Sequence, residues 1–149
     1  MNYDSYLENR VYGASPAELV CLLYRKAIEK TKVARLALEQ GDISTRAAAL
    51  TRVIEIASEL ANSLVEPQGS DSATREMISN LRRLYEYLIF LAAEANAKQS
   101  SAPLDEIERT LSTLLEAWES IAQPAASATV PDSAQPSLAT PRLALSFHG

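Results

Sequence analysis

Residues 81–95 read LRRLYEYLIFLAAEA, and no glycine or proline interrupts them. Around this stretch apolar residues recur three or four positions apart, which is the spacing of one face of an α-helix. They are Met77, Leu81, Leu84, Tyr85, Leu88, Leu91, Ala92 and Ala95. Strands run for only about five or six residues, so the stretch predicts a long amphipathic helix.

Three more segments of the chain carry helical periodicity. Up to position 123, glycine and proline fall only at widely spaced points, which leaves uninterrupted segments of about 17–42, 42–66, 70–102 and 104–123. In the first segment the apolar face is read as Leu19, Leu23, Ala27, Lys30, Ala34 and Ala37. In the last, it runs from Leu104 to Ile121.

The ends of the first two helices are marked by capping residues. Ser15 and Glu18 have the spacing of a capping box, with Pro16 at a position where a helix has a free N–H in any case. Gly41 is a plausible left-handed terminator. Asp42 or Ser44 then caps the start of the second helix.

Four amphipathic helices joined by short connections bury their apolar faces most simply as an antiparallel four-helix bundle. We therefore predict an all-α fold with the bundle over residues 15–122. A short amphipathic segment, residues 1–14, precedes it. Residues 123–149 are rich in Ala, Ser and Pro, a composition typical of a disordered tail. The apolar end of that tail, Leu143 to Phe147, suggests the hypothesis that it folds back on the bundle.

The charge of the chain excludes several classes of partner. With 14 Lys and Arg against 19 Asp and Glu, the net charge is −5, and no basic stretch exists to bind nucleic acid or an anionic membrane. No run approaches the roughly 18 apolar residues of a membrane span, so we predict no membrane insertion. The N-terminus lacks the pattern of a signal peptide, and the single cysteine, Cys21, fits a reducing compartment. A cytoplasmic location is expected.

The sequence offers no constellation for catalysis. Its only histidine, His148, is next to last, so neither a Glu-x-x-His metal pair nor a Ser–His or Cys–His pair can be written within the helices. Glycine-rich phosphate loops are absent. Most carboxylates occupy polar helix positions near Lys or Arg and read as a solvated face. The chain is therefore predicted not to be an enzyme and to need no metal or other cofactor.

The informative feature is more apolar surface than one core requires. Residues 88–93 are six apolar residues in succession, and residues 19–24 form a second such run. A helix that is apolar all round cannot bury every side in one seam. The surplus indicates a binding groove or a partner interface. It fits equally a central helix of an irregular bundle, or the face of a homodimer.

The N-terminal segment has a helical pattern of its own. Tyr3, Tyr6, Leu7 and Val11 recur at helical spacing ahead of Gly13. A helix so short is unstable alone. It would dock into a groove of the bundle and detach when a partner arrives, or it would simply pack or fray as termini do.

Ordered blocks of residues resemble the FliS family of flagellin export chaperones. The N-terminal block is Tyr6, Val11, Ala14-Ser15-Pro16-x-Glu18-Leu19 and Leu23-Tyr24. The blocks that follow are Leu81-x-x-Leu84-Tyr85-x-Tyr87 with Leu91 and Ala95-Asn96, then Leu104-x-x-Ile107, Leu114-Leu115 and Ala117-Trp118. The resemblance covers about residues 1–122. Arg25-Lys26 departs from it, because the family usually has an acidic residue and glycine there.

The resemblance implies a cytoplasmic chaperone without cofactors. Such a protein binds the C-terminal segment of new flagellin, prevents its early polymerisation and helps to deliver it to the flagellar type III export gate. Tyr6, Leu7 and Val11 would then be a cap that covers the groove in the free protein. Our hypothesis for the flagellin-binding groove is Leu19, Leu22, Leu23, Leu50, Ile54, Ile89, Leu91 and Trp118, although Trp118 also suits the core. The competing reading is a non-catalytic helical adaptor or a self-associating structural bundle.

Overall fold

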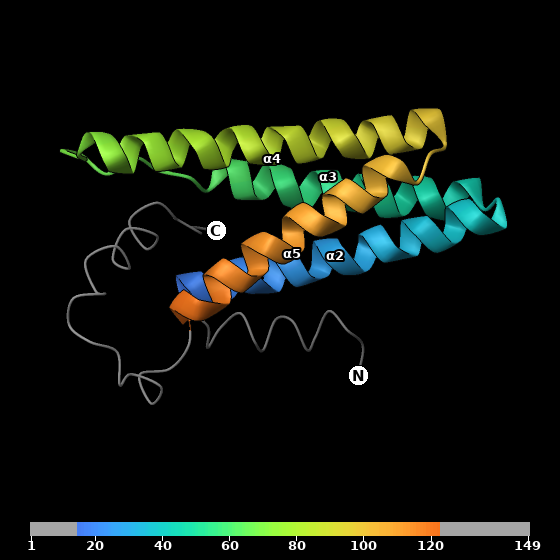
Figure 1. Cartoon of the computed structure of the whole chain (residues 1–149), viewed down its shortest axis with the longest axis horizontal. Coiled ribbons are helices and arrows are strands. Elements are labelled where there is room, and N and C mark those ends of the chain that lie inside the picture. Colours follow the sequence, from blue (N-terminus) through green and yellow to red (C-terminus); the bar gives the residue numbers. More distant parts are fainter. Residues whose placement is uncertain (1–14, 123–149) are drawn as a thin grey trace.

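The structure is a computed structural model that describes residues 15–122. Over that range four α-helices follow one another: α2 (Pro16–Gln40), α3 (Ile43–Asn62), α4 (Ser72–Lys98) and α5 (Ala102–Ala122). The expected all-α class is confirmed (Figure 1). The N-terminal cap residues Tyr6, Leu7 and Val11 and the tail from 123 onward lie outside the described residues.

The helix ends follow the capping signals of the sequence. The Ser15 hydroxyl accepts the Glu18 N–H at 3.2 Å while the Glu18 carboxylate accepts the Ser15 N–H at 3.0 Å. Gly41 has φ +70°, so a glycine there ends α2 without the strain that a side chain would bring. Asp42, rather than Ser44, caps α3 by accepting the Thr45 N–H at 3.1 Å. These predictions are confirmed.

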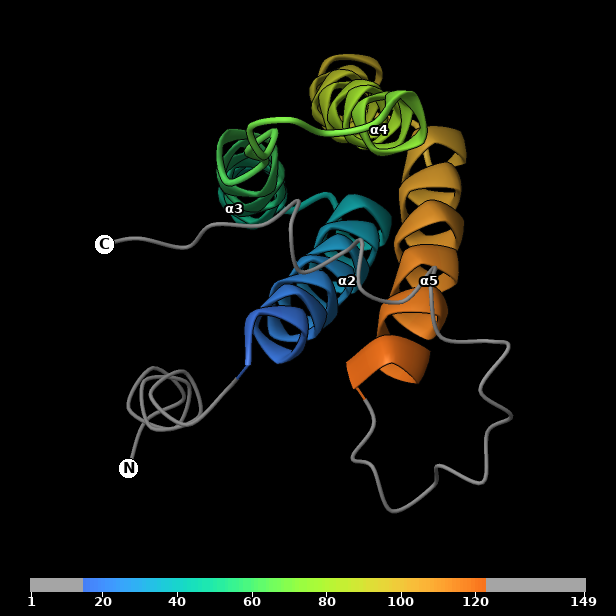
Figure 2. The same ribbon diagram turned by 90° about the vertical axis from the view of Figure 1, so that its left-hand side faces the viewer.

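Successive helices run antiparallel, which confirms the bundle, but the four are not evenly packed. α2 lies between α3 and α5, and α3 lies beside α4 (Figures 1 and 2). α5 begins beside the C-terminal end of α4 and then crosses over α2 (Figure 1). It contacts α2 extensively and α4 much less. The first half of α4 is therefore left without α5 as a neighbour.

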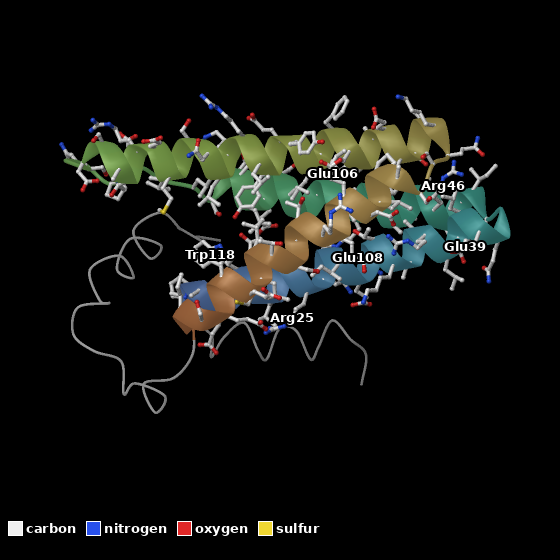
Figure 3. The ribbon with its side chains drawn as sticks, viewed as in Figure 1. Arg25, Glu39, Arg46, Glu106, Glu108 and Trp118 are labelled. Carbon is white, nitrogen blue, oxygen red and sulfur yellow. The ribbon has the colours of Figure 1, made fainter. Side chains whose placement is uncertain are left out.

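Ion pairs hold α5 along the outer edge of α2. Arg25 pairs with Glu119, and Arg35 pairs with both Asp105 and Glu108. Figure 3 shows Arg25 and Glu108 on this edge. Against α4, the Tyr87 hydroxyl donates to the Glu106 carboxylate at 2.7 Å. That contact lies near the start of α5, where α4 and α5 are still adjacent.

A buried aromatic cluster joins α2, α4 and α5. The hydroxyls of Tyr24 and Tyr85 are 2.7 Å apart, and both side chains are fully buried. The Trp118 ring stands edge-on to Tyr24 with 6.5 Å between ring centroids, a favourable geometry for aromatic pairs. Burial raises the pKa of Tyr24, and it raises the pKa of Tyr85 to about 12. Both tyrosines are therefore neutral hydrogen-bonding groups of the core.

The buried face of α2 differs in part from the one read from the sequence. Ala27, Ala34 and Ala37 are buried as expected, but Val20 and Tyr24 take the places expected for Leu19 and Leu23. Because Tyr24 finds a hydroxyl partner in Tyr85 and an aromatic neighbour in Trp118, it occupies the centre of the interface. The leucines one position earlier are turned by about 100° to the flank of the helix.

Candidate binding surfaces

The eight residues predicted for the groove separate into three groups in the structure. Leu19, Leu22 and Leu23 are all partly buried on α2. Their spacing of three and four places them on one face of that helix. Together they form a short apolar strip that the core does not fully enclose, and we call it the α2 strip.

Ile54 and Ile89 lie on a different side of the bundle, at the seam between α3 and α4. Arg82 donates to the carbonyl of Ala61 at 3.1 Å, and Arg46 donates to the Asn96 side chain at 3.1 Å. These two bonds fix the register of the antiparallel pair and place Ile54 level with Ile89. Both isoleucines are partly buried and pack against the core.

The last three residues of the predicted groove are parts of the core. Leu50, Leu91 and Trp118 are 1%, 3% and 5% exposed. A partner would reach them only if the helices separated. The alternative reading of Trp118, as a core residue, therefore describes its position in the folded protein.

A groove between α2 and α3 adjoins the α2 strip. It has a volume of about 370 Å³, and small side chains and three cations line it. The lining residues are Lys26, Lys30, Val33, Thr45, Ala48, Ala49 and Arg52. Of these cations, Lys26 is itself buried and Arg52 pairs with Glu55 at 3.5 Å, so the protein already neutralises part of the positive charge. The groove offers a partner segment the apolar side chains of Val33, Ala48 and Ala49 beside a partly neutralised cationic rim.

A second apolar surface, which the predicted groove did not include, lies on the first half of α4. It is an open trough of about 400 Å³ lined by Ala73, Glu76, Met77, Asn80, Leu81 and Leu84. We call it the α4 trough. Met77, Leu81 and Leu84 belong to the apolar face read from the sequence, so the signal was present. Their partial exposure follows from the path of α5, which the sequence pattern does not give.

Two aromatic side chains extend the apolar surface of α4 toward its second half. Tyr87 and Phe90 are 40% and 57% exposed, and their rings stack with centroids 6.3 Å apart. The hydrogen bond to Glu106 raises the pKa of the Tyr87 hydroxyl. Exposed aromatic residues are enriched at protein interfaces.

Over residues 15–122 the polar side chains form no site for catalysis. No group of three or more His, Cys, Asp or Glu residues there is placed to hold a metal ion. Every buried side-chain nitrogen and oxygen in that range has a hydrogen-bond partner. The Cys21 thiol is buried, and burial raises its pKa, which makes it a poor nucleophile. None of α2 to α5 is long and apolar enough to cross a membrane.

The fold and these surfaces define a helical bundle suited to binding another polypeptide through apolar faces. Comparison with known proteins agrees with this class. The family described as Flagellar protein FliS matches residues 1–125. The flagellar secretion chaperone FliS of Salmonella typhimurium is 35% identical over 116 residues, which cover 77% of this chain and 82% of that protein.

Two further relatives have corresponding names. The flagellar secretion chaperone FliSB of Pseudomonas aeruginosa is 31% identical, over 77% of this chain and 87% of its own length. The flagellar secretion chaperone FliS of Vibrio cholerae is 27% identical, over 77% of this chain and 81% of its own length. The chain belongs to the FliS family of flagellar secretion chaperones. These names describe chaperones and not enzymes, in agreement with the predicted absence of an enzymatic role.

Proposed function

We propose that the protein binds the C-terminal segment of flagellin in the cytoplasm, keeps it from polymerising early and helps to deliver it to the flagellar type III export apparatus. The observation that supports the proposal is the partly exposed α2 strip beside the α2–α3 groove. Membership of the FliS family supports a flagellar protein as partner. A partner that orders on binding needs a large apolar interface, since ordering offsets part of the interaction energy.

The proposal predicts that a charge on the α2 strip weakens flagellin binding. Leu22→Glu places a carboxylate on the strip, whereas Ile43→Glu makes the same kind of change at the first residue of α3, where the side chain is 61% exposed. Calorimetric titration with the C-terminal segment of flagellin from the same organism should show tight one-to-one binding by the wild type and by Ile43→Glu. Leu22→Glu should lose at least about tenfold in affinity, or about 1.4 kcal/mol.

Burial of apolar surface also gives a thermodynamic signature, a negative heat-capacity change on binding. No binding to flagellin by a folded wild-type protein would sink the proposal. If that protein also sedimented as a stable homodimer, the self-associating bundle would become the better reading. Equal losses for the two glutamate variants would retain flagellin as the partner but move its site away from the α2 strip.

The N-terminal segment is proposed to act as a cap on the α2 strip through Tyr6, Leu7 and Val11. Flagellin would then have to displace the cap, and its apparent affinity would depend on the difference between the two affinities. Leu7→Asp should weaken the cap and so raise the affinity for flagellin. An unchanged or lower affinity would argue against a competing cap.

A further inference from the structure

The α4 trough is an apolar surface that the bundle itself leaves open. Its floor is apolar, with Met77, Leu81 and Leu84 partly buried, and Glu76 stands on its rim. The trough belongs to a different helix from the α2 strip and lies outside the predicted flagellin groove. The proposed binding of flagellin to the α2 strip therefore does not account for the α4 trough.

The sequence contains an apolar segment beyond the last described helix. Residues 142–147 read Arg-Leu-Ala-Leu-Ser-Phe, after a stretch made largely of Ala, Ser and Pro. The match to the FliS family ends at residue 125, so this segment is an addition to the part shared with the family. Three of its side chains, Leu143, Leu145 and Phe147, are large and apolar.

The position where the described chain ends places this segment within reach of the trough. Ala122 lies at the same end of the bundle as the first half of α4 (Figure 1). The roughly 20 residues between Ala122 and Arg142 span about 65 Å when extended and about 25 Å as a flexible coil. α4 itself, with 27 residues, is about 40 Å long. The linker therefore reaches the trough without having to be fully extended.

The charges of the two partners are complementary. Glu76 is an exposed carboxylate on the rim of the trough. Arg142 directly precedes the three apolar side chains of the tail. A guanidinium next to an apolar segment matches a carboxylate next to an apolar floor, and this pairing sets the order in which the tail would lie.

We propose that residues 142–147 dock in the α4 trough of the same chain. Leu143, Leu145 and Phe147 cover the apolar floor, and Arg142 lies beside Glu76. A tether of this length gives an effective concentration on the order of millimolar, so even a weak contact is substantially occupied. The docked tail shields the part of α4 that α5 leaves open, and any helix that binds there has to displace it.

Paramagnetic relaxation in the full chain tests this directly. A nitroxide is attached at Ser146→Cys, while Cys21 is 2% exposed and protected from the reagent. Amide signals of residues 73–84 should lose most of their intensity relative to the reduced label, and those of residues 45–52, in the α2–α3 groove, should not. Replacing Leu143, Leu145 and Phe147 together by Ser should restore the signals of residues 73–84.

Three results would overturn the proposal. Weak and uniform broadening would mean that the tail has no docking site, and broadening centred on another face would assign it elsewhere. Broadening of isotope-labelled chains by separate spin-labelled chains would show docking onto a second copy. The experiment contains no flagellin, so its outcome is independent of the proposed chaperone function.

Discussion

Both halves of α4 carry an apolar face at helical spacing, but the two faces have different environments. In the second half Leu88, Leu91, Ala92 and Ala95 are all buried, because both α3 and α5 cover them. In the first half only Ile78 and Tyr85 are buried, and the other large apolar side chains form the α4 trough. The comparison shows that the path of a neighbouring helix decides whether an apolar face of α4 becomes core or remains available to a partner.

The largest expected difference between the halves is in core truncation. Leu88→Ala removes a side chain that is 1% exposed and should lower the free energy of unfolding by about 2–5 kcal/mol. Leu81→Ala, in the trough, should cost about 1 kcal/mol, since the site is already open to solvent. Urea denaturation of the two variants measures both values. Equal losses would mean that the first half is as well covered as the second.

Alkaline pH should destabilise the protein through Tyr85, which lies at the boundary between the two halves of α4. Its pKa is raised from 10.0 to about 12 in the folded protein, so the folded state keeps a proton that the unfolded chain loses. The stability that Tyr85 contributes to the folded state is therefore fully present below pH 10. As the pH rises from 10 to 12, the free energy of unfolding falls by about 1.4 kcal/mol per pH unit. Denaturation at several alkaline pH values should show a shallower fall for Tyr85→Phe than for the wild type.

At neutral pH the Tyr85→Phe change tests the hydrogen bond alone. It leaves the ring in the core but takes away the partner of the Tyr24 hydroxyl, at a cost of about 1–2 kcal/mol. Tyr87→Phe is the matched control, because it removes a hydroxyl whose bond to Glu106 is exposed. Thermal unfolding should place the control much closer to the wild type. The reverse order would show that the Glu106 contact dominates the packing of α5.

The smallest effect concerns what keeps α5 on α2. Arg35→Met removes the ion pairs with Asp105 and Glu108 and should cost no more than about 1 kcal/mol. Screening should shrink the difference from the wild type at high salt, which unfolding at two ionic strengths would measure. A loss that did not depend on salt would point to the packing of the arginine stem instead.

The features that were predictable from sequence are those set by neighbouring residues. The Ser15–Glu18 capping box, the Gly41 terminator and the periodicity of α4 need only a few positions to be recognised. That Tyr24 and not Leu23 is buried in the core depends on Tyr85, which is 61 positions away in the sequence. No local pattern reveals this contact. For the same reason the sequence alone does not distinguish Leu50 and Leu91, which are core residues, from leucines at the surface.

The exposure of the α4 trough also could not be predicted from a local sequence pattern. Its residues were identified as an apolar face, but that face was expected to be covered. Only the oblique course of α5, held to α2 by Arg25 and Arg35, leaves it open. The course of α5 depends on contacts between residues far apart in the sequence, such as Tyr24 with Trp118, and helical periodicity does not encode them.

The aromatic cluster also gives the protein an optical label of its own. Trp118 is the single tryptophan of the chain, and the ring of Tyr24 lies 6.5 Å from it. The ring of Trp118 is 5% exposed while α2 and α5 remain in contact. Emission of the unmodified protein therefore reports on the place where α5 packs against α2, and a partner that separates these helices would expose Trp118 to water and shift its emission to longer wavelength.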